Sequence, residues 1–445
     1  MAIHRPVYVI ADDLTGTCDT AAQFASSGIK TFSYVLPVAF ATDPPDDDLA
    51  AEIICVNTNT RTSSSDVSNK RYYEIGLKLR TLQYKRLFKK IDTALRGNIG
   101  PELAGLMTAT RAKLALVAPA LPHEGRTTIG GRQYIQGVAV EETNFANDPL
   151  SPVKESHLPT LLKPFWGNAV EVVSVDTTRS GRLADFLEDS VVRGIKVVVI
   201  DAESYEDLEA VALAVHDRAD SIFVGSLSIA LALKYYWFKS ITHGQRLDSG
   251  QALHVGKSLL LCGSRNERSL AQLEWVRKNM EKEVAVIQIT ANNIRYWLAN
   301  GMADKELIFE IKRAGTECKD IACFIRPSDD STIHLNDIER IIESYLAFVA
   351  TTIIKTNKIS GLAIIGGDTA MKICCELGIG FVEVTGDIGM VAAASTVRKG
   401  PFTGLRIVTK GGSVGSISIC KDLFRHLAPI ALSPSLDHPV TKNSG

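Results

Sequence analysis

The sequence of 445 residues has no excess of charge of either sign, because 49 Lys and Arg residues face 50 Asp and Glu residues. A net charge of −1 gives no field that could hold a polyanion, so nucleic acid is not an expected partner. The apolar runs, such as 114–120, are far shorter than the ~20 residues that span a bilayer. No membrane partner is therefore expected.

Signatures of metal and cofactor chemistry are missing as well. The eight cysteines form no CxxC pair and the nine histidines form no HExxH motif, so we assign no metal site to protein ligands and expect reduced thiols in the cytoplasm. Residues 250–258 place five residues between glycines where a P-loop has four, and a strand follows where a helix is required. Residues 410–415 have the wrong glycine spacing for a dinucleotide fingerprint. Neither a standard NTPase nor a dehydrogenase or lyase is indicated.

What the sequence does contain is a regular alternation of short β-branched runs and segments with helical periodicity. This pattern predicts an α/β fold, and the length predicts two α/β domains, each with a mostly parallel sheet covered by helices. A polar stretch with three glycines at 240–257 marks the boundary, so we expect domains at 1–245 and 255–430 and a tail at 431–445. The expected strands are 7–10, 53–56, 86–91, 114–118, 170–175, 197–200 and 221–224, then 259–262, 284–289, 321–325, 362–365, 381–384 and 405–408.

Polar side chains follow the first two expected strands, where ligands of parallel sheets bind. Asp12 and Asp13 end the first strand and precede Thr15 and Gly16, which favours contacts with hydroxyls or a metal ion over simple helix capping. Arg61 follows the second strand, where a fixed cation can grip an anion or remain a surface charge.

The third strand leads into the segment KKIDTALRGNIGPEL at 89–103. The guanidinium of an arginine matches a carboxylate with two parallel hydrogen bonds, and an aspartate accepts from sugar hydroxyls, so this segment suits a small, oxygen-rich acid. Its candidate binding residues are Lys90, Ile91, Asp92, Thr93 and Arg96. After the fourth strand, Arg126 beside Gly125 is a further candidate.

Three strand tips of the second domain carry glycines and hydroxyls instead. Such tips expose backbone N–H groups at helix N-termini, which suits phosphate oxygens and favours a nucleotide. The candidate residues are Ser264, Gly366, Gly367, Asp368, Thr369, Lys410, Gly411 and Gly412.

Taken together, these motifs resemble the four-carbon acid sugar kinase family, whose members phosphorylate tetronic acids with ATP. The matching segments occur in order over nearly the whole chain, at 10–24, 89–103, 118–134, 142–149, 262–274, 366–370 and 408–415. The resemblance implies that the first domain binds a sugar acid, that the second binds ATP with Mg²⁺, and that the ligand cleft lies between them. The IDTALRGNIG segment is more similar to the threonate and erythronate kinases than to the 3-oxo-tetronate kinases.

The resemblance also implies roles for these residues in phosphorylating the 4-hydroxyl of D-threonate or D-erythronate. The substrate carboxylate is expected on Arg61 or Arg96 with Lys90 nearby, its hydroxyls on Asp12, Asp13 and Asp92, and ATP on the glycine-lined tips, with Lys410 or an arginine offsetting charge. The catalytic carboxylate remains open among Asp13, Asp92 and Asp368. The alternatives are a 3-oxo-tetronate 4-kinase and a non-catalytic sugar-acid or nucleotide-binding protein, and a homodimer is the assembly considered.

Overall fold

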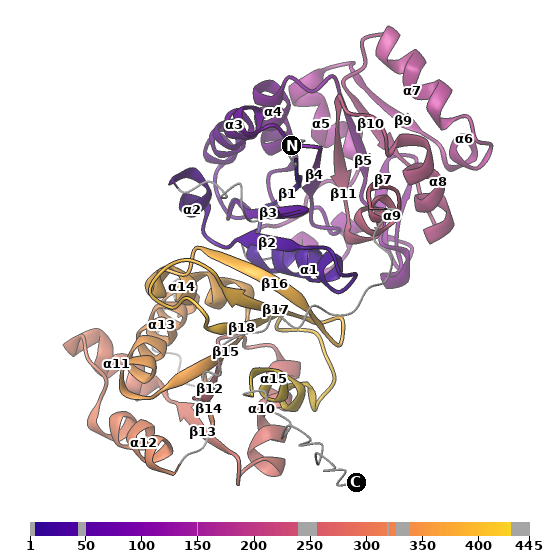
Figure 1. The fold of residues 1–445 in the computed structure, drawn as a ribbon. Coiled ribbons are helices and arrows are strands. Elements are labelled where there is room, and N and C mark those ends of the chain that lie inside the picture. The colour runs from indigo at the N-terminus through magenta and orange to yellow at the C-terminus, as the bar shows by residue number, and fades with distance from the viewer. Residues whose placement is uncertain are drawn as a thin grey trace, which may run out of the picture.

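The structure is a computed structural model that describes residues 5–42, 50–148, 150–238, 256–317, 320–325 and 338–428. The expected boundary at 245–255 and the expected tail at 431–445 lie outside these residues. Figure 1 shows a mixed α/β molecule in two parts, an N-terminal half (5–238, indigo to magenta) and a C-terminal half (256–428, salmon to yellow). Within the described residues, no helix is long and apolar enough to cross a membrane.

Eight parallel strands form the main sheet of the N-terminal half, in the order β2-β3-β1-β4-β11-β5-β10-β9. Their bounds are β1 Val7–Ala11, β2 Thr31–Tyr34, β3 Ile53–Asn57, β4 Arg86–Lys90, β5 Leu114–Ala118, β9 Val170–Val173, β10 Val197–Ile200 and β11 Ser221–Gly225. The helices are α1 Leu14–Ala25, α2 Pro37–Thr42, α3 Ser65–Leu82, α4 Ile99–Thr110, α5 Leu158–Trp166, α6 Val175–Arg179, α7 Leu183–Val192, α8 Tyr205–Val215 and α9 Leu227–Trp237. A small separate sheet contains β6 Arg126–Ile129, β7 Arg132–Ile135 and β8 Val138–Ala139.

In the C-terminal half, β13, β14, β12, β15 and β18 are parallel, and β17 and β16 follow with antiparallel pairing. Their bounds are β12 Lys257–Cys262, β13 Val284–Ile289, β14 Asp320–Ile325, β15 Ile359–Ile365, β16 Phe381–Ile388, β17 Ala392–Val397 and β18 Arg406–Lys410. The helices are α10 Glu267–Asn279, α11 Ala291–Asn300, α12 Lys305–Thr316, α13 Ile338–Thr356, α14 Gly367–Leu377 and α15 Ile419–Leu427.

The alternation of side chains along β1 explains how helices cover both faces of the sheet. Val7 and Val9 belong to a core cluster that includes residues of α1, α8 and α9, whereas Tyr8 and Ile10 belong to a cluster with residues of α3 and α4. Successive side chains of a strand point to opposite faces, so a strand that is apolar at every position is buried on both. The predicted α/β class, with mostly parallel strands covered by helices, is confirmed.

The two halves share one hydrogen-bonded sheet of fifteen strands, because β2 pairs with β16 in antiparallel register, from Phe381 opposite Tyr34 to Val384 opposite Thr31. Six strand steps separate β1 from β15, and a twist of about 20–25° per step rotates the strands by roughly 120–150°. The pairs β18–β17, β17–β16 and β16–β2 are antiparallel, so β1 and β15 would point in opposite directions in a flat sheet. The twist offsets most of this difference in direction. The carboxyl ends of β1 and β15 therefore come to the same side of the molecule.

Candidate active site

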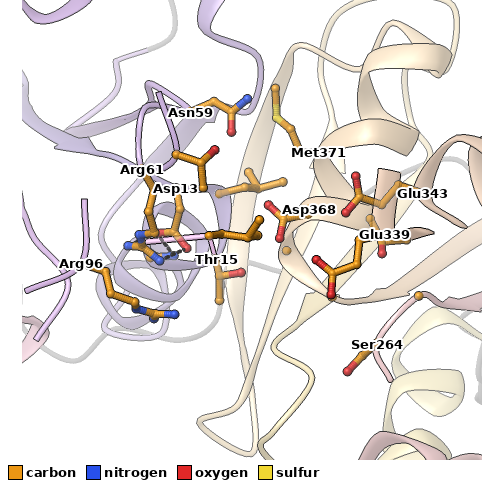
Figure 2. A pocket seen from close by; sticks show the side chains of 18 of the residues that line it. Asp13, Thr15, Asn59, Arg61, Arg96, Ser264, Glu339, Glu343, Asp368 and Met371 are labelled. Atoms are coloured by element: carbon orange, nitrogen blue, oxygen red, sulfur yellow. Dashed lines mark hydrogen bonds and ion pairs between the residues drawn. The ribbon is translucent and has the colours of Figure 1, made fainter. Parts of the chain in front are cut away.

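A cavity of about 690 Å³ lies between the two halves, where the carboxyl ends of strands from both meet. Residues that follow β1, β3 and β4 form one wall, and residues that follow β12 and β15, together with part of α13, form the other. Figure 2 shows Asp13, Arg61 and Arg96 on one side facing Glu343 and Asp368 on the other. Both predicted groups of strand tips thus open into one space.

Arg61 is held between two carboxylates. Its Nε and Nη2 donate to the two oxygens of Asp12 at 2.9 Å each, Nη2 also donates to Asp13 Oδ1 at 2.9 Å, and Nη1 lies 2.8 Å from Asp13 Oδ2. Asp13 is the N-cap of α1 and accepts a hydrogen bond from the Gly16 amide at 3.0 Å. Burial raises the pKa of Asp13, against the effect of Arg61. Asp12 is buried behind Arg61 and does not line the cavity.

Arg96 is the second cation on this wall and pairs with Asp92 through two bonds. Its Nε and Nη2 donate to the two oxygens of Asp92 at 2.9 and 3.2 Å, and its Nη1 lies 3.3 Å from Asp148 Oδ2. Burial acts to raise the pKa of Asp92, but Arg61 and Arg96 outweigh it and hold that pKa well below its usual range. Asp92 is therefore ionised throughout the neutral range.

Lys90 ends β4 beside the same wall. Its ammonium donates to the Ile91 carbonyl at 3.0 Å and lies 3.8 Å from where a Cβ of Gly16 would stand, which places it over the first turn of α1. Below it, fully buried, Lys89 pairs with Glu102 at 2.6 Å. A buried pair of this kind fixes the path of β4 and α4, since loss of one partner leaves an uncompensated charge.

Thr93 and Arg126 contact each other at the edge of the site, outside the cavity lining. The Arg126 guanidinium also lies 3.2 Å from Glu124 and 6.0 Å from the ring of Phe145, and Arg96 lies 5.3 Å from the same ring. Phe145 thus packs beside both cations and orients Arg96.

Three carboxylates line the opposite wall: Glu339 and Glu343 of α13 and Asp368 of α14. Burial, followed by the charges of Asp368 and Glu339, raises the pKa of Glu343 to about 7. Burial likewise raises the pKa of Asp368.

The glycines of this wall allow close approach of backbone. Gly366 has φ +113°, a conformation that favours glycine, and it begins the turn into α14. A Cβ at Gly367 would overlap the hydroxyl of Thr15, and a Cβ at Gly263 would overlap that of Thr369. The Gly366 amide donates to the Lys410 carbonyl at 2.9 Å, whereas Gly367, Asp368 and Thr369 form the first turn of α14 at the cavity wall. The amides of a first helical turn have no partner within the helix, which suits an anion.

Lys410 does not line the main cavity. Its ammonium is buried and donates to the carbonyls of Gly411 and Val414 at 2.6 and 2.9 Å. Gln272 donates to the Val414 carbonyl as well, at 3.1 Å, and to the carbonyls of Gly415 and Ser416. These hydrogen bonds fix the 411–416 loop to α10 and to the end of β18. Gly412 packs against Ser264, so Gly411 and Gly412 support the cavity wall from behind.

The structure brings ten of the predicted site residues to the cavity and leaves seven away from it. The ten lining residues are Asp13, Arg61, Lys90, Asp92, Arg96, Ser264, Gly366, Gly367, Asp368 and Thr369. The other seven are Asp12, Ile91, Thr93, Arg126, Lys410, Gly411 and Gly412, and they stand behind or beside it.

Sequence reasoning missed the lining residues that come from helices and from more distant loops. These are mainly Thr15, Asp19, Asn59, Asp148, Glu339 and Glu343. For Asp19 a signal was present, since it lies four residues after Thr15 on a helix that starts at a polar strand tip. For Glu339 and Glu343 no local pattern indicates a site.

The side chains that line the cavity limit how a metal ion could bind there. Within the described residues, no group of three or more His, Cys, Asp or Glu side chains could hold one. Mg²⁺ in phosphate-transferring sites commonly uses one or two carboxylates together with substrate phosphates. Asp368 and Glu343, beside the glycine-lined tips, fit that mode, whereas a cage of protein ligands alone does not.

Two family models match the chain. One describes a sugar-binding N-terminal domain and matches residues 7–233, and the other describes a nucleotide-binding C-terminal domain and matches residues 259–419.

Similar proteins include a D-threonate kinase of Salmonella typhimurium, 27% identical over 94% of this chain and 97% of its own, and a D-erythronate kinase of Heliobacterium modesticaldum, 25% identical over 92% and 94%. A 3-oxo-tetronate kinase of Salmonella typhimurium is 26% identical over 66% of this chain and 70% of its own. Among solved structures, a Salmonella typhimurium protein described as a putative tRNA synthase has the same fold, with a TM-score of 0.76, 20% identity, and coverage of 95% and 99%.

Proposed function

The chain belongs to the four-carbon acid sugar kinase family, and on this premise we propose that it transfers the γ-phosphoryl group of ATP to the 4-hydroxyl of D-threonate, with D-erythronate as the alternative acceptor. One observation carries the proposal: a single cavity has paired arginines and aspartates on one wall and glycine-lined helix N-termini on the other. Phosphoryl transfer needs an acceptor and a donor held face to face in a shared space.

The acceptor's carboxylate binds to Arg96 and Lys90. Arg61 was the other candidate, but it already faces the carboxylates of Asp12 and Asp13 and so holds the wall together. Arg96 also pairs with two carboxylates, but its side chain is more exposed than that of Arg61, at 27% against 17%, and each of its two Nη atoms keeps one N–H for the substrate. Lys90 lines the cavity and has no carboxylate within ion-pair distance among the described residues. Substrate hydroxyls bind to lone pairs of Asp13 and Asp92 that their arginines leave free.

The triphosphate lies on the opposite wall. The amides in the first turn of α14, from Gly367 to Thr369, and the hydroxyl of Ser264 bind phosphate oxygens. Lys410 contributes indirectly, because its hydrogen bonds fix the 411–416 loop that supports this wall. Asp368 and Glu343 would hold Mg²⁺, which neutralises phosphate charge when bound.

D-threonate is favoured over a 3-oxo-tetronate because the similarity to threonate and erythronate kinases extends over more than nine-tenths of the chain, whereas that to the 3-oxo-tetronate kinase covers two thirds. A carbonyl at C3 would also lack the hydroxyl that the acidic groups of this wall accept from.

A coupled assay of ADP release tests the proposal. Purified protein with ATP and Mg²⁺ is given D-threonate, D-erythronate, L-threonate and 3-oxo-tetronates in separate reactions. We expect D-threonate to give the highest kcat/KM and D-erythronate the next. If no acid stimulates ADP release while calorimetry shows that the protein binds ATP, the kinase assignment is wrong and a non-catalytic binding protein is favoured.

A further inference from the structure

Asp19 of α1 occupies a position that no other carboxylate of the described chain shares. It lines the main cavity between the halves, together with Asp13 and Lys90. It also packs close to Gly366 and Lys410 of the C-terminal half, in a narrow contact between the two halves. Asp19 therefore lies where the acid-binding wall meets the glycine-lined tips.

The carboxylate of Asp19 has no partner. Within the described residues, neither of its oxygens accepts a hydrogen bond or forms an ion pair. Its neighbours differ in this respect, since Asp13 is bound by Arg61 and the Gly16 amide, and Asp92 is bound by Arg96. The Asp19 side chain is only partly buried and lines the cavity without a protein donor, so its oxygens are available to a ligand.

Three charged side chains of the described residues act on the Asp19 carboxylate. Asp13 caps the same helix, Lys90 comes from the end of β4, and Glu124 comes from the 3-10 turn Pro122–Glu124. Lys410, at the end of β18, turns its ammonium to the carbonyls of Gly411 and Val414 instead. Burial, followed by the charge of Asp13, raises the pKa of Asp19 to about 7, with Lys90 acting in the opposite direction. A carboxyl that titrates near neutral pH is matched to proton transfer at that pH.

We propose that Asp19 is the general base that takes the proton of the acceptor hydroxyl, an inference that rests on the proposed kinase function. The O–H bond of the 4-hydroxyl breaks and its proton passes to a carboxylate oxygen of Asp19. The freed oxygen forms a bond to the γ-phosphorus as the bond from that phosphorus to the bridging oxygen breaks, and that electron pair leaves on ADP. Asp19 then returns the proton to solvent.

The sequence left the base open among Asp13, Asp92 and Asp368, and each has a different task in the structure. Asp13 and Asp92 each have both oxygens bound to an arginine, so both are fixed in place and suited to orienting the acceptor, and the pKa of Asp92 is also held low by Arg61 and Arg96. Asp368 stands in the first turn of α14, on the phosphate side.

The test compares Asp19→Asn, Asp19→Ala and Asp19→Glu with the wild type over pH 5.5–9, and Asp185→Asn is the matched control. Asp185 is an exposed carboxylate on α7, far from the cavity. For the wild type with D-threonate, kcat/KM should rise through a midpoint near pH 7. Asp19→Asn and Asp19→Ala should each lose about 10²–10⁴-fold in kcat and lose this acidic limb, with ATP binding by calorimetry unchanged. Asp19→Glu should recover part of the rate together with the limb.

The outcomes separate the two proposals. If the wild type turns over none of the four acids, the kinase function fails and takes the base assignment with it. If the wild type is active but both Asp19→Asn and Asp19→Ala keep a rate within a few-fold of it, or keep the acidic limb, Asp19 is not the base. An Asp19 variant that loses ATP binding along with rate would assign the residue a structural role instead.

Discussion

At the scale of single residues, two carboxylates of the cavity differ in protonation because burial raises the pKa of Asp19, whereas Arg61 and Arg96 lower the pKa of Asp92. Asp92 is held by Arg96 in a two-bond pair and stays ionised. Asp19 has no donor in the part of the chain that the structure describes, and burial raises its pKa to about 7. Two aspartates of one cavity are thereby divided into an orienting group and a proton acceptor.

The raised pKa of Asp19 predicts a cost in stability that depends on pH. The unfolded chain loses this proton near pH 4, whereas the folded protein keeps it up to about pH 7. The folded state binds more protons between these values, so the contribution of Asp19 to stability falls as the pH rises through this window. Asp19→Asn should therefore raise the Tm by roughly 2–4 °C at pH 8 and by less than half as much at pH 5. Thermal melts at both pH values check this, and an equal shift at both would contradict it.

The proposed contact between Arg96 and the substrate carboxylate predicts that Arg96 variants have a higher KM for the sugar acid. Charge-assisted hydrogen bonds are worth about 1.5–3 kcal/mol each, so Arg96→Ala should raise the KM for the sugar acid roughly 10–100-fold and leave the KM for ATP unchanged. Arg96→Lys keeps the charge but not the two-bond fork, so it should restore only part of this loss. Arg179→Ala is the control, because Arg179 forms a similar pair with Asp207 away from the cavity. A normal KM in Arg96→Ala would place the carboxylate elsewhere.

At the scale of elements, the N-termini of α1 and α14 meet across the cavity, and Gly367 permits this contact. Gly367→Ala should lower the Tm and raise the KM for ATP, because the new methyl group overlaps the Thr15 hydroxyl. In a Thr15→Ala background the overlap is gone, and Gly367→Ala should then be neutral or stabilising by up to about 1 kcal/mol, as alanine is the better helix former. A double-mutant cycle by thermal melts measures this, and additive effects would show that the helices do not touch there.

Many elements were predictable because their side chains are patterned for burial on both faces. The β-branched run at 197–200 is an example, and it forms β10. Strand β17 was not predicted, because its residues AAASTV are half alanine and lack the strand preference of branched side chains. Strand β2, which is only four residues long, was not predicted either.

At the scale of the whole molecule, the joining of both halves into one sheet could not be predicted. The pairing of β2 with β16 links residues about 350 positions apart, and no local pattern identifies which edges meet. The site was partly predictable, because ligands of parallel sheets bind at the carboxyl ends of the strands, where Asp13 and Gly366 lie. Glu343 could not be predicted, because only the packing of α13 against α14 brings it there.

The most direct test of the account is a crystal structure of the protein with D-threonate and a non-hydrolysable ATP analogue bound together. We predict the acid on the wall of Arg96, the triphosphate on the tips at Gly366 and Gly367, and the 4-hydroxyl about 2.6–3.2 Å from a carboxylate oxygen of Asp19. The same hydroxyl should lie about 3–3.5 Å from the γ-phosphorus. Both ligands bound in the same half, or a 4-hydroxyl turned away from the γ-phosphate, would contradict the account.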